Sequence, residues 1–317
     1  MVFFDVGSAK SELKNYYDVV VIGGGPAGLT AAIYARQSGL SVLVLEKDLE
    51  GGYMNLTESI ENYPGFTSIR GEELGVKMVE HATHFGAHLY TDGAERIEVS
   101  KDEKLVHLES GKKVHAKVVI VAAGSKPKQL GVPGEGEFRA RGVSYCATCD
   151  GHFFKDGHVV VVGGGNSAFD ESLFLSKMVK KVTIVHILEK PTADARLREK
   201  VESNEKIEYR PLTELVRIEG DDRVKQVVLK NLRTNEEYTM EVDGVFIFVG
   251  MTPNSQILEG LAEFDQWGYV ITDENMETKT AGIFAVGDIR SKNLRQIITA
   301  ASDGAIAAFT AAHKYFE

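Results

Sequence analysis

The chain has 317 residues, of which 43% are hydrophobic and 26% charged, and its formal net charge is -10. This composition is typical of a globular protein, and the length predicts about two domains. The acidic balance argues against nucleic-acid or membrane partners, because both present anionic surfaces. No apolar run approaches the roughly 20 residues that span a bilayer, and the N-terminus lacks the pattern of a secretory signal. We therefore expect a cytoplasmic protein.

The first predicted unit is a strand, a glycine-rich turn, a helix and a second strand. Residues 17–23 and 41–45 are short apolar, β-branched runs typical of buried parallel strands. Between them, residues 29–38 are predicted to be helical, with Pro26 near the start and Gly39 just past the end. The segment therefore predicts one complete β-α-β unit.

The turn in this unit fits the pattern G-x-G-x-x-G through Gly23, Gly25 and Gly28. The first glycine permits a tight turn, the second lets the backbone approach a pyrophosphate, and the third allows close helix–strand packing. Glu46 stands at the end of the second strand, where it can accept hydrogen bonds from an adenosine ribose. The alternative is that these glycines serve only helix–strand packing.

Three histidines that follow this unit are candidate metal ligands. His81, His84 and His88 are expected on one amphipathic helix. Their spacing could hold a metal ion, but no cysteine or carboxylate constellation supports it. We therefore predict no metal site.

The two cysteines, Cys146 and Cys149, form a single C-x-x-C. So short a loop stabilises a fold little, which makes redox chemistry the stronger interpretation and a structural crosslink the weaker. A helix N-terminus beneath the pair would stabilise a thiolate. Asp150 comes next, followed by the apolar Phe153 and Phe154, so it could hold or pass a proton. The alternative for Asp150, a capping or solvated carboxylate, remains open.

A second β-α-β unit follows the cysteines. A strand at residues 158–162 leads into a turn that fits G-x-G-x-x-A, and this turn begins 140 residues after the first one. A helix at 169–178 and a strand at 182–185 complete the pattern. The repetition predicts two nucleotide-binding domains of similar design. The pattern glycines and alanine are Gly163, Gly165 and Ala168.

The residues after this unit determine its nucleotide preference. No arginine occurs between residues 186 and 192 to clamp a 2′-phosphate. Glu189 could instead receive a ribose hydroxyl, which would favour NADH over NADPH. The alternative is that Glu189 is a solvated loop charge.

The remainder carries weaker signals. Residues 206–241 read as strands and hairpins, 244–249 as a strand, and 296–316 as an alanine-rich helix that packs closely. Gly287 and Asp288 end a predicted strand, where the carboxylate could meet a ribitol hydroxyl. Arg295 and Gln296, at the start of the last helix, could approach a phosphate or a flavin carbonyl.

Over essentially its whole length, the sequence resembles the low-molecular-weight thioredoxin reductases of bacteria and archaea. The most specific element is SYCATCDG at residues 144–151, just before the second turn. The other matching segments lie at residues 51–52, 61–65, 122–124, 250–254, 282–288 and 295–296.

The resemblance implies an α/β protein with two Rossmann-like three-layer nucleotide-binding domains of the FAD/NAD(P)-linked disulfide reductase type, the second inserted in the first. It implies that FAD binds to residues 1–125 and 251–317. An NAD(P)-binding-like domain would then occupy 126–250 and carry the C-x-x-C. The inserted domain would rotate on hinges near residues 124–128 and 250–253, and the protein would be a homodimer.

The resemblance also assigns roles to residues. Cys149 would lie against the flavin, Cys146 would attack the disulfide of thioredoxin, and Asp150 would be their acid/base partner. The implied FAD contacts are Gly23, Gly25, Pro26, Ala27, Gly28, Glu46, Lys47, Gly51, Gly52, Tyr53, Asn62, Ala123, Gly124, Gly287, Asp288, Arg295 and Gln296. The implied NAD(P) contacts are Gly163, Gly165, Asn166, Ser167, Ala168, His186 and Glu189.

Two departures from the family pattern concern the nucleotides. Ile187, Leu188 and Thr192 stand where NADPH-specific members carry three arginines, and Tyr53 replaces a usual glutamine. We therefore predict a thioredoxin reductase that uses NADH, or NADH and NADPH together. The runner-up donor is reduced ferredoxin or a deazaflavin. A different class of function, a redox sensor whose C-x-x-C reports the flavin state to a partner, is the third hypothesis.

Overall fold

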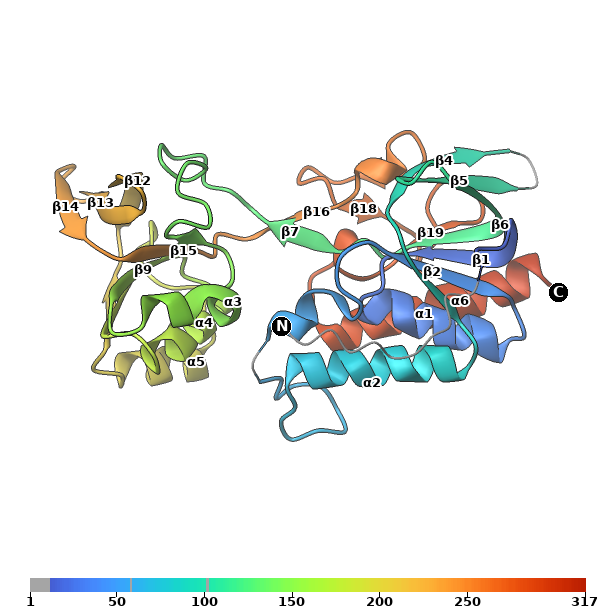
Figure 1. The fold of residues 1–317 in the computed structure, drawn as a ribbon, viewed down its shortest axis with the longest axis horizontal. Coiled ribbons are helices and arrows are strands. Elements are labelled where there is room, and N and C mark those ends of the chain that lie inside the picture. Colours follow the sequence, from blue (N-terminus) through green and yellow to red (C-terminus); the bar gives the residue numbers. More distant parts are fainter. Residues whose placement is uncertain (1–11, 58, 101–102) are drawn as a thin grey trace. The chain divides into compact units, whose positions relative to one another are not determined.

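The computed structural model describes residues 12–57, 59–100 and 103–317 (Figure 1). The chain divides into two compact units: one runs to Lys126 and resumes at Thr252–Glu317, and the other is Pro127–Met251. The chain passes between the units in two strands that pair with each other, β7 (Ser125–Pro127) and β16 (Met251–Pro253). Most of the N-terminal segment in which no secretory signal is predicted lies outside the described residues.

The first unit is built on a seven-stranded sheet in the order β3-β2-β1-β6-β5-β4, with β19 paired to β6. β1 runs parallel to β2 and β6, so the first glycine turn leaves β1 at the carboxyl edge of this parallel part. The strands are β1 (Tyr16–Ile22), β2 (Val42–Glu46), β3 (His88–Thr91), β4 (Ala94–Val99), β5 (Lys104–Leu108), β6 (Lys113–Val121) and β19 (Ile283–Ala285).

Three helices cover one face of this sheet: α1 (Pro26–Gln37), α2 (Gly71–His84) and α6 (Ile297–Tyr315) (Figure 1). The alanine-rich α6 packs closely on α1, since a Cβ at Gly304 would lie 2.1 Å from the carbonyl oxygen of Ala27. A second apolar core fills the other face, under η3 (Gln256–Leu258) and the hairpin of β17 (Glu263–Phe264) and β18 (Val270–Ile271). In the part of the chain that the structure describes, no helix is long and apolar enough to cross a membrane.

The second unit has a parallel sheet in the order β11-β10-β9-β15-β8, between helices on one face and an antiparallel sheet, β12-β13-β14, on the other. Its strands are β8 (Val143–Ser144), β9 (His158–Val162), β10 (Lys181–Val185), β11 (Ile207–Arg210), β12 (Thr213–Gly220), β13 (Val224–Asn231), β14 (Glu237–Glu241) and β15 (Gly244–Ile247). Its helices are α3 (Ala147–Asp150), η2 (Gly151–Phe154), α4 (Asn166–Ser176) and α5 (Ala195–Glu202).

Side-chain alternation along β9 separates the two cores of this unit. Val160 and Val162 pack toward the antiparallel sheet, whereas Val159 and Val161 pack toward α4. The predicted α/β class, with two Rossmann-like three-layer units, is confirmed.

The predicted helix through His81, His84 and His88 is wrong at its end. α2 stops at His84, and Gly86 turns the chain with a φ of +85°, a left-handed conformation that favours glycine. His88 then begins β3, where its Nδ1 is hydrogen-bonded to the hydroxyl of Tyr17. Among the described residues, no group of three or more His, Cys, Asp or Glu side chains is placed to hold a metal ion.

Candidate active site

The first glycine turn combines two tightly packed glycines with one that faces open space. Gly23 has a φ of +108°, and a Cβ at Gly28 would lie 1.9 Å from the carbonyl oxygen of Gly23, so both positions need glycine. Gly25 differs, because apart from its own and its chain neighbours' atoms no described atom lies within 4 Å of the position its Cβ would take. α1 begins at Pro26, the residue after Gly25. The N–H groups of its first turn, from Ala27 onward, therefore lie beside this open space.

Glu46, at the end of β2, is fixed beside this turn. Its Oε2 accepts the N–H of Gly24 at 2.7 Å, and its Oε1 accepts the N–H of Asp48 at 2.9 Å. A carboxylate has about four acceptor positions, so each oxygen keeps capacity for a further donor. The neighbouring Gly51 N–H donates to the carbonyl of Gly24 at 2.8 Å, which brings residues 51–52 to the same turn.

The segment after β19 reaches the same turn from the other end of the chain. Gly287 adopts a φ of +77°, and a Cβ there would lie 2.9 Å from the Cβ of Ala27. The Gly287 N–H donates to Oδ2 of the buried Asp303 at 3.0 Å. Oδ1 of Asp288 is buried with no hydrogen-bond partner among the described residues, and burial raises the pKa of this carboxyl group.

The remaining residues predicted to contact FAD make the following contacts within the first unit. Asn62 donates from Nδ2 to Oε1 of Gln296 at 3.0 Å, which joins two of them. Lys47 forms an exposed ion pair with Glu109, and Tyr53 is exposed. The structure places the rest as follows: Gly52 beside Gly25, the carbonyls of Ala123 and Gly124 as acceptors from Asn254, and the Arg295 guanidinium 3.7 Å from the ring centroid of Tyr269.

The second glycine turn repeats the geometry of the first. Gly163 has a φ of +143°, and a Cβ there would lie 2.3 Å from the carbonyl oxygen of Phe248. A Cβ at Gly165 would lie 3.6 Å from the Thr192 hydroxyl, an ordinary van der Waals distance, so the turn is open at Gly165. Ala168 is fully buried. Asn166 and Ser167, which open α4, are exposed; Asn166 is hydrogen-bonded to Asp194 at the start of α5.

The strand ends beside the second turn show what nucleotide chemistry is available. The ring of His186 packs over Gly164, and burial lowers the pKa of its imidazole, which favours the neutral form. Ile187 and Leu188 are exposed. Glu189 is also exposed, and its Oε1 lies 3.1 Å from the guanidinium of Arg233, in the β13–β14 hairpin. An arginine, which residues 186–192 lack, therefore reaches Glu189 from another part of the unit.

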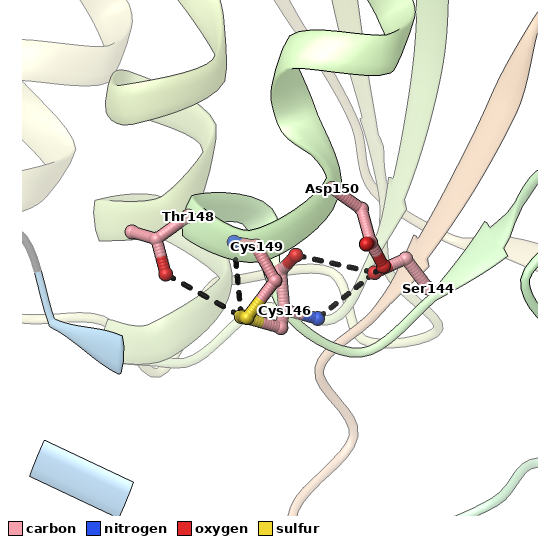
Figure 2. The surroundings of a disulfide bond; sticks show 5 residues. All are labelled: Ser144, Cys146, Thr148, Cys149 and Asp150. Atoms are coloured by element: carbon pink, nitrogen blue, oxygen red, sulfur yellow. Dashed lines mark hydrogen bonds between the residues drawn. A yellow bond between two sulfur atoms is a disulfide. The ribbon is translucent and has the colours of Figure 1, made fainter. Parts of the chain in front are cut away.

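Figure 2 shows the disulfide between Cys146 and Cys149. Cys146 is the N-cap of the short helix α3, and its Sγ accepts the N–H of Cys149 at 3.1 Å. The hydroxyl of Thr148 donates to the same sulfur at 3.4 Å. Cys149 is exposed and Cys146 half-buried. Hydrogen bonds of this kind stabilise a thiolate on Cys146 once the disulfide is reduced.

Asp150 lies at the end of α3 but does not cap the following turn with its side chain. Instead its Oδ2 accepts the hydroxyl of Ser144 at 2.6 Å (Figure 2). The capping alternative for Asp150 is therefore wrong for its side chain, which makes no capping hydrogen bond to that turn. The side chain is half-buried next to the dithiol.

Three residues of these sites were not predicted from the sequence: Ser144, Arg233 and Asp303. Ser144 belongs to the SYCATCDG segment, which was its only signal. Arg233 and Asp303 act across long sequence separations, on Glu189 and Gly287 respectively, so no local pattern marks them.

Two glycine-rich turns, one in each unit, together with a C-x-x-C disulfide are typical of flavin- and pyridine-nucleotide-linked disulfide reductases. The chain belongs to the pyridine nucleotide-disulphide oxidoreductase family, whose sequence model matches residues 17–304. Within this family, the predicted resemblance to low-molecular-weight thioredoxin reductases is confirmed.

Three relatives illustrate the similarity. A thioredoxin reductase from Bacillus subtilis (strain 168) is 48% identical over 302 residues, which cover 95% of each chain. The crystal structure of Lactococcus lactis thioredoxin reductase (FR conformation) has 42% identity and a TM-score of 0.91, covering 94% of this chain and 98% of that one. A ferredoxin-flavin thioredoxin reductase from Clostridium acetobutylicum has 30% identity and a TM-score of 0.51, covering 94% and 98%.

Proposed function

We propose that this protein is a flavin-dependent thioredoxin-disulfide reductase. It passes electrons from NADH, NADPH or both through FAD to the Cys146–Cys149 dithiol, and from there to thioredoxin. The observation that carries the proposal is the disulfide itself, because one of its sulfurs already accepts hydrogen bonds from Thr148 and from the Cys149 N–H. When a nucleophile attacks the Cys149 sulfur, these hydrogen bonds stabilise the Cys146 thiolate that is released.

The first unit fits FAD on three observations. The open space at Gly25 lies where a pyrophosphate would meet the N–H groups that begin α1. Glu46 keeps acceptor capacity for a ribose. Oδ1 of Asp288, without a partner among the described residues, suits a hydroxyl donor of the ribitol chain. When bound, FAD supplies a two-electron carrier between the electron donor and the dithiol.

The dithiol steps follow from the hydrogen bonds of the two sulfurs. A reductant that attacks the exposed Cys149 breaks the disulfide and releases Cys146 as the stabilised thiolate. This thiolate attacks thioredoxin, forms a mixed disulfide and releases one thioredoxin sulfur, which takes a proton from Asp150. Cys149 then attacks Cys146 in the mixed disulfide, which restores the internal disulfide and releases reduced thioredoxin.

The boundaries of the two units support this division of work. We assign FAD to the unit that ends at Lys126 and resumes at Thr252, and the pyridine nucleotide to the inserted unit. Because FAD and the dithiol then belong to different units, the paired strands β7 and β16 are the proposed hinge.

The electron donor is tested by mixing the purified yellow protein anaerobically with NADH, NADPH or reduced ferredoxin and following the flavin absorbance. We expect NADH to bleach it. Bleaching by reduced ferredoxin or a deazaflavin alone would support the runner-up donor. The similarity to a ferredoxin-flavin thioredoxin reductase favours this alternative. A non-turnover redox sensor is rejected if catalytic amounts of the protein sustain the reduction of thioredoxin.

The nucleotide preference makes a prediction about Ile187 and Leu188. Both side chains are exposed, so arginines fit there without disturbing the core. We expect Ile187→Arg/Leu188→Arg to raise kcat/KM for NADPH about tenfold or more, because a charge-assisted hydrogen bond to a phosphate is worth about 1.5–3 kcal/mol. Steady-state kinetics with both nucleotides measure the change. The control Ile187→Gln/Leu188→Gln adds polarity without charge; an equal gain there contradicts the explanation.

Thr148 carries a second prediction about the dithiol. Thr148→Val keeps the shape of the side chain but removes the hydroxyl that donates to Sγ of Cys146. Losing one hydrogen bond of about 1 kcal/mol predicts an approximately fivefold lower rate of Cys146 alkylation by iodoacetamide near pH 7. Thr148→Ser, which keeps the hydroxyl, serves as the control. Equal alkylation rates in all three proteins would contradict the proposed stabilisation.

We further propose a cytoplasmic homodimer. The dimer is supported by exposed apolar side chains along α6, at Ile298, Ile306 and Phe309, which lie on one side of the helix. Sedimentation of the purified protein measures the oligomeric state. No nucleic-acid partner is proposed, since the net charge of -10 opposes phosphate binding over the surface.

A further inference from the structure

Ser144 is a buried side chain that touches both parts of the dithiol site. It is the last residue of β8 and is 4% exposed. Its hydroxyl lies 2.6 Å from Oδ2 of Asp150, accepts the N–H of Cys146 at 3.0 Å, and lies 3.2 Å from the carbonyl oxygen of Cys146. Figure 2 shows the hydroxyl between the carboxyl group and the backbone of Cys146. It therefore has two acceptors and one donor around it.

A hydroxyl has one hydrogen, so Ser144 can donate to Asp150 or to the carbonyl of Cys146, but not to both at once. When Asp150 is a carboxylate, the hydrogen points to Oδ2 at 2.6 Å, a charge-assisted bond. When Asp150 is protonated, the acid hydrogen can point to Oγ of Ser144, and the serine hydrogen turns to the carbonyl of Cys146. In both states every group keeps a partner.

We propose that Ser144 is a positioning residue for Asp150, which holds the carboxyl group beside the dithiol and supplies it with a hydrogen-bond partner before and after proton transfer. This inference rests on the proposed thioredoxin reductase function. The Cys146 thiolate attacks a disulfide, one sulfur leaves and takes the proton of Asp150, and the resulting carboxylate accepts the hydrogen of Ser144. The disulfide substrate is the only oxidant in this step.

The first experiment compares Ser144→Ala with the wild type. The holoenzyme is reduced with dithiothreitol, freed of it, and mixed with bis(2-hydroxyethyl) disulfide at pH 7, and the loss of protein thiols is followed. Without the hydroxyl, Asp150 loses the partner that holds its carboxyl group beside the dithiol. Because one hydrogen bond is worth about 1 kcal/mol, we expect the rate to fall about fivefold.

Two variants control for structural effects. Ser144→Thr keeps a hydroxyl and restores the wild-type rate. Ser176→Ala removes another buried hydroxyl of the same unit, one that is bonded to Leu173 and Asn204. The rate of Ser176→Ala stays at the wild-type value. A loss in Ser176→Ala as large as that in Ser144→Ala, or no loss in Ser144→Ala, overturns the inference.

A double-mutant cycle with Asp150→Asn completes the test, because a residue that acts through Asp150 has nothing to act on in its absence. We expect Ser144→Ala to change the rate of the Asp150→Asn protein by less than about twofold. Additive effects would show that Ser144 acts by another route, which overturns the inference. This assay needs neither thioredoxin nor an electron donor. Failure to reduce thioredoxin, with the coupling between Ser144 and Asp150 intact, would thus count against the proposed function and not against Ser144.

Discussion

Replacing Cys146 by serine is expected to lower thioredoxin reduction by at least about 10³-fold, because the substitution removes the nucleophile and leaves a hydroxyl that is not ionised at neutral pH. Replacing Cys149 by serine is expected to cause a similar loss of turnover for a different reason. There the first attack on the substrate still occurs, but no second thiol is present to resolve the mixed disulfide. Turnover is measured as NADH- or NADPH-dependent thioredoxin reduction.

A trapping experiment separates the two roles. The substrate is a thioredoxin with one active-site cysteine, activated as its thionitrobenzoate disulfide. Cys149→Ser should release one equivalent of thionitrobenzoate and retain a stable adduct of the two proteins on a non-reducing gel. Cys146→Ser should give little adduct. The reverse outcome would show that Cys149 attacks thioredoxin and Cys146 resolves the mixed disulfide. Full turnover in both variants would show that the disulfide takes no part in the reaction. Flavin content is the control, since both cysteines lie in the inserted unit.

The two glycine-rich turns were predictable because their requirements are local. A left-handed backbone at Gly23 and Gly163 and a close approach at Gly28 each demand a residue without a side chain, so the pattern is present in a few consecutive positions. The β-branched strands on either side are equally local. Even here, the helices begin at Pro26 and Asn166, three residues earlier than predicted, because the helix starts within the turn itself.

The parts that escaped prediction depend on packing between distant segments. Arg233 reaches Glu189 only because the β13–β14 hairpin folds beside the end of β10, 44 positions away. The buried Asp303 supports Gly287 from the first half of α6 and also pairs with Arg290 and Lys292. The end of α2 did leave a local signal, the left-handed Gly86, which the histidine spacing obscured.

Loss of FAD is the expected result of Gly25→Val. Gly25 has a φ of -80° and ψ of -174°, an extended conformation that valine adopts readily. Apart from its own and its chain neighbours' atoms, no described atom lies within 4 Å of its Cβ position. The fold should therefore accept the side chain. The methyl groups would instead occupy the space beside the first N–H groups of α1, where the pyrophosphate is proposed to bind. We expect a folded but colourless protein, with FAD affinity lowered at least about 100-fold.

Two comparisons make this result specific. Gly136→Val is the matched control. This glycine is exposed, its φ is not left-handed, and apart from its own and its chain neighbours' atoms no described atom lies within 4 Å of its Cβ position. That variant should therefore remain yellow. Gly28→Val should fail to fold properly, because its Cβ would lie 1.9 Å from the carbonyl oxygen of Gly23. Flavin absorbance, FAD titration of the apoprotein and circular dichroism distinguish lost binding from lost folding. If Gly25→Val is folded and binds FAD as the wild type does, the pyrophosphate lies elsewhere, because a valine at this position cannot share the space with it.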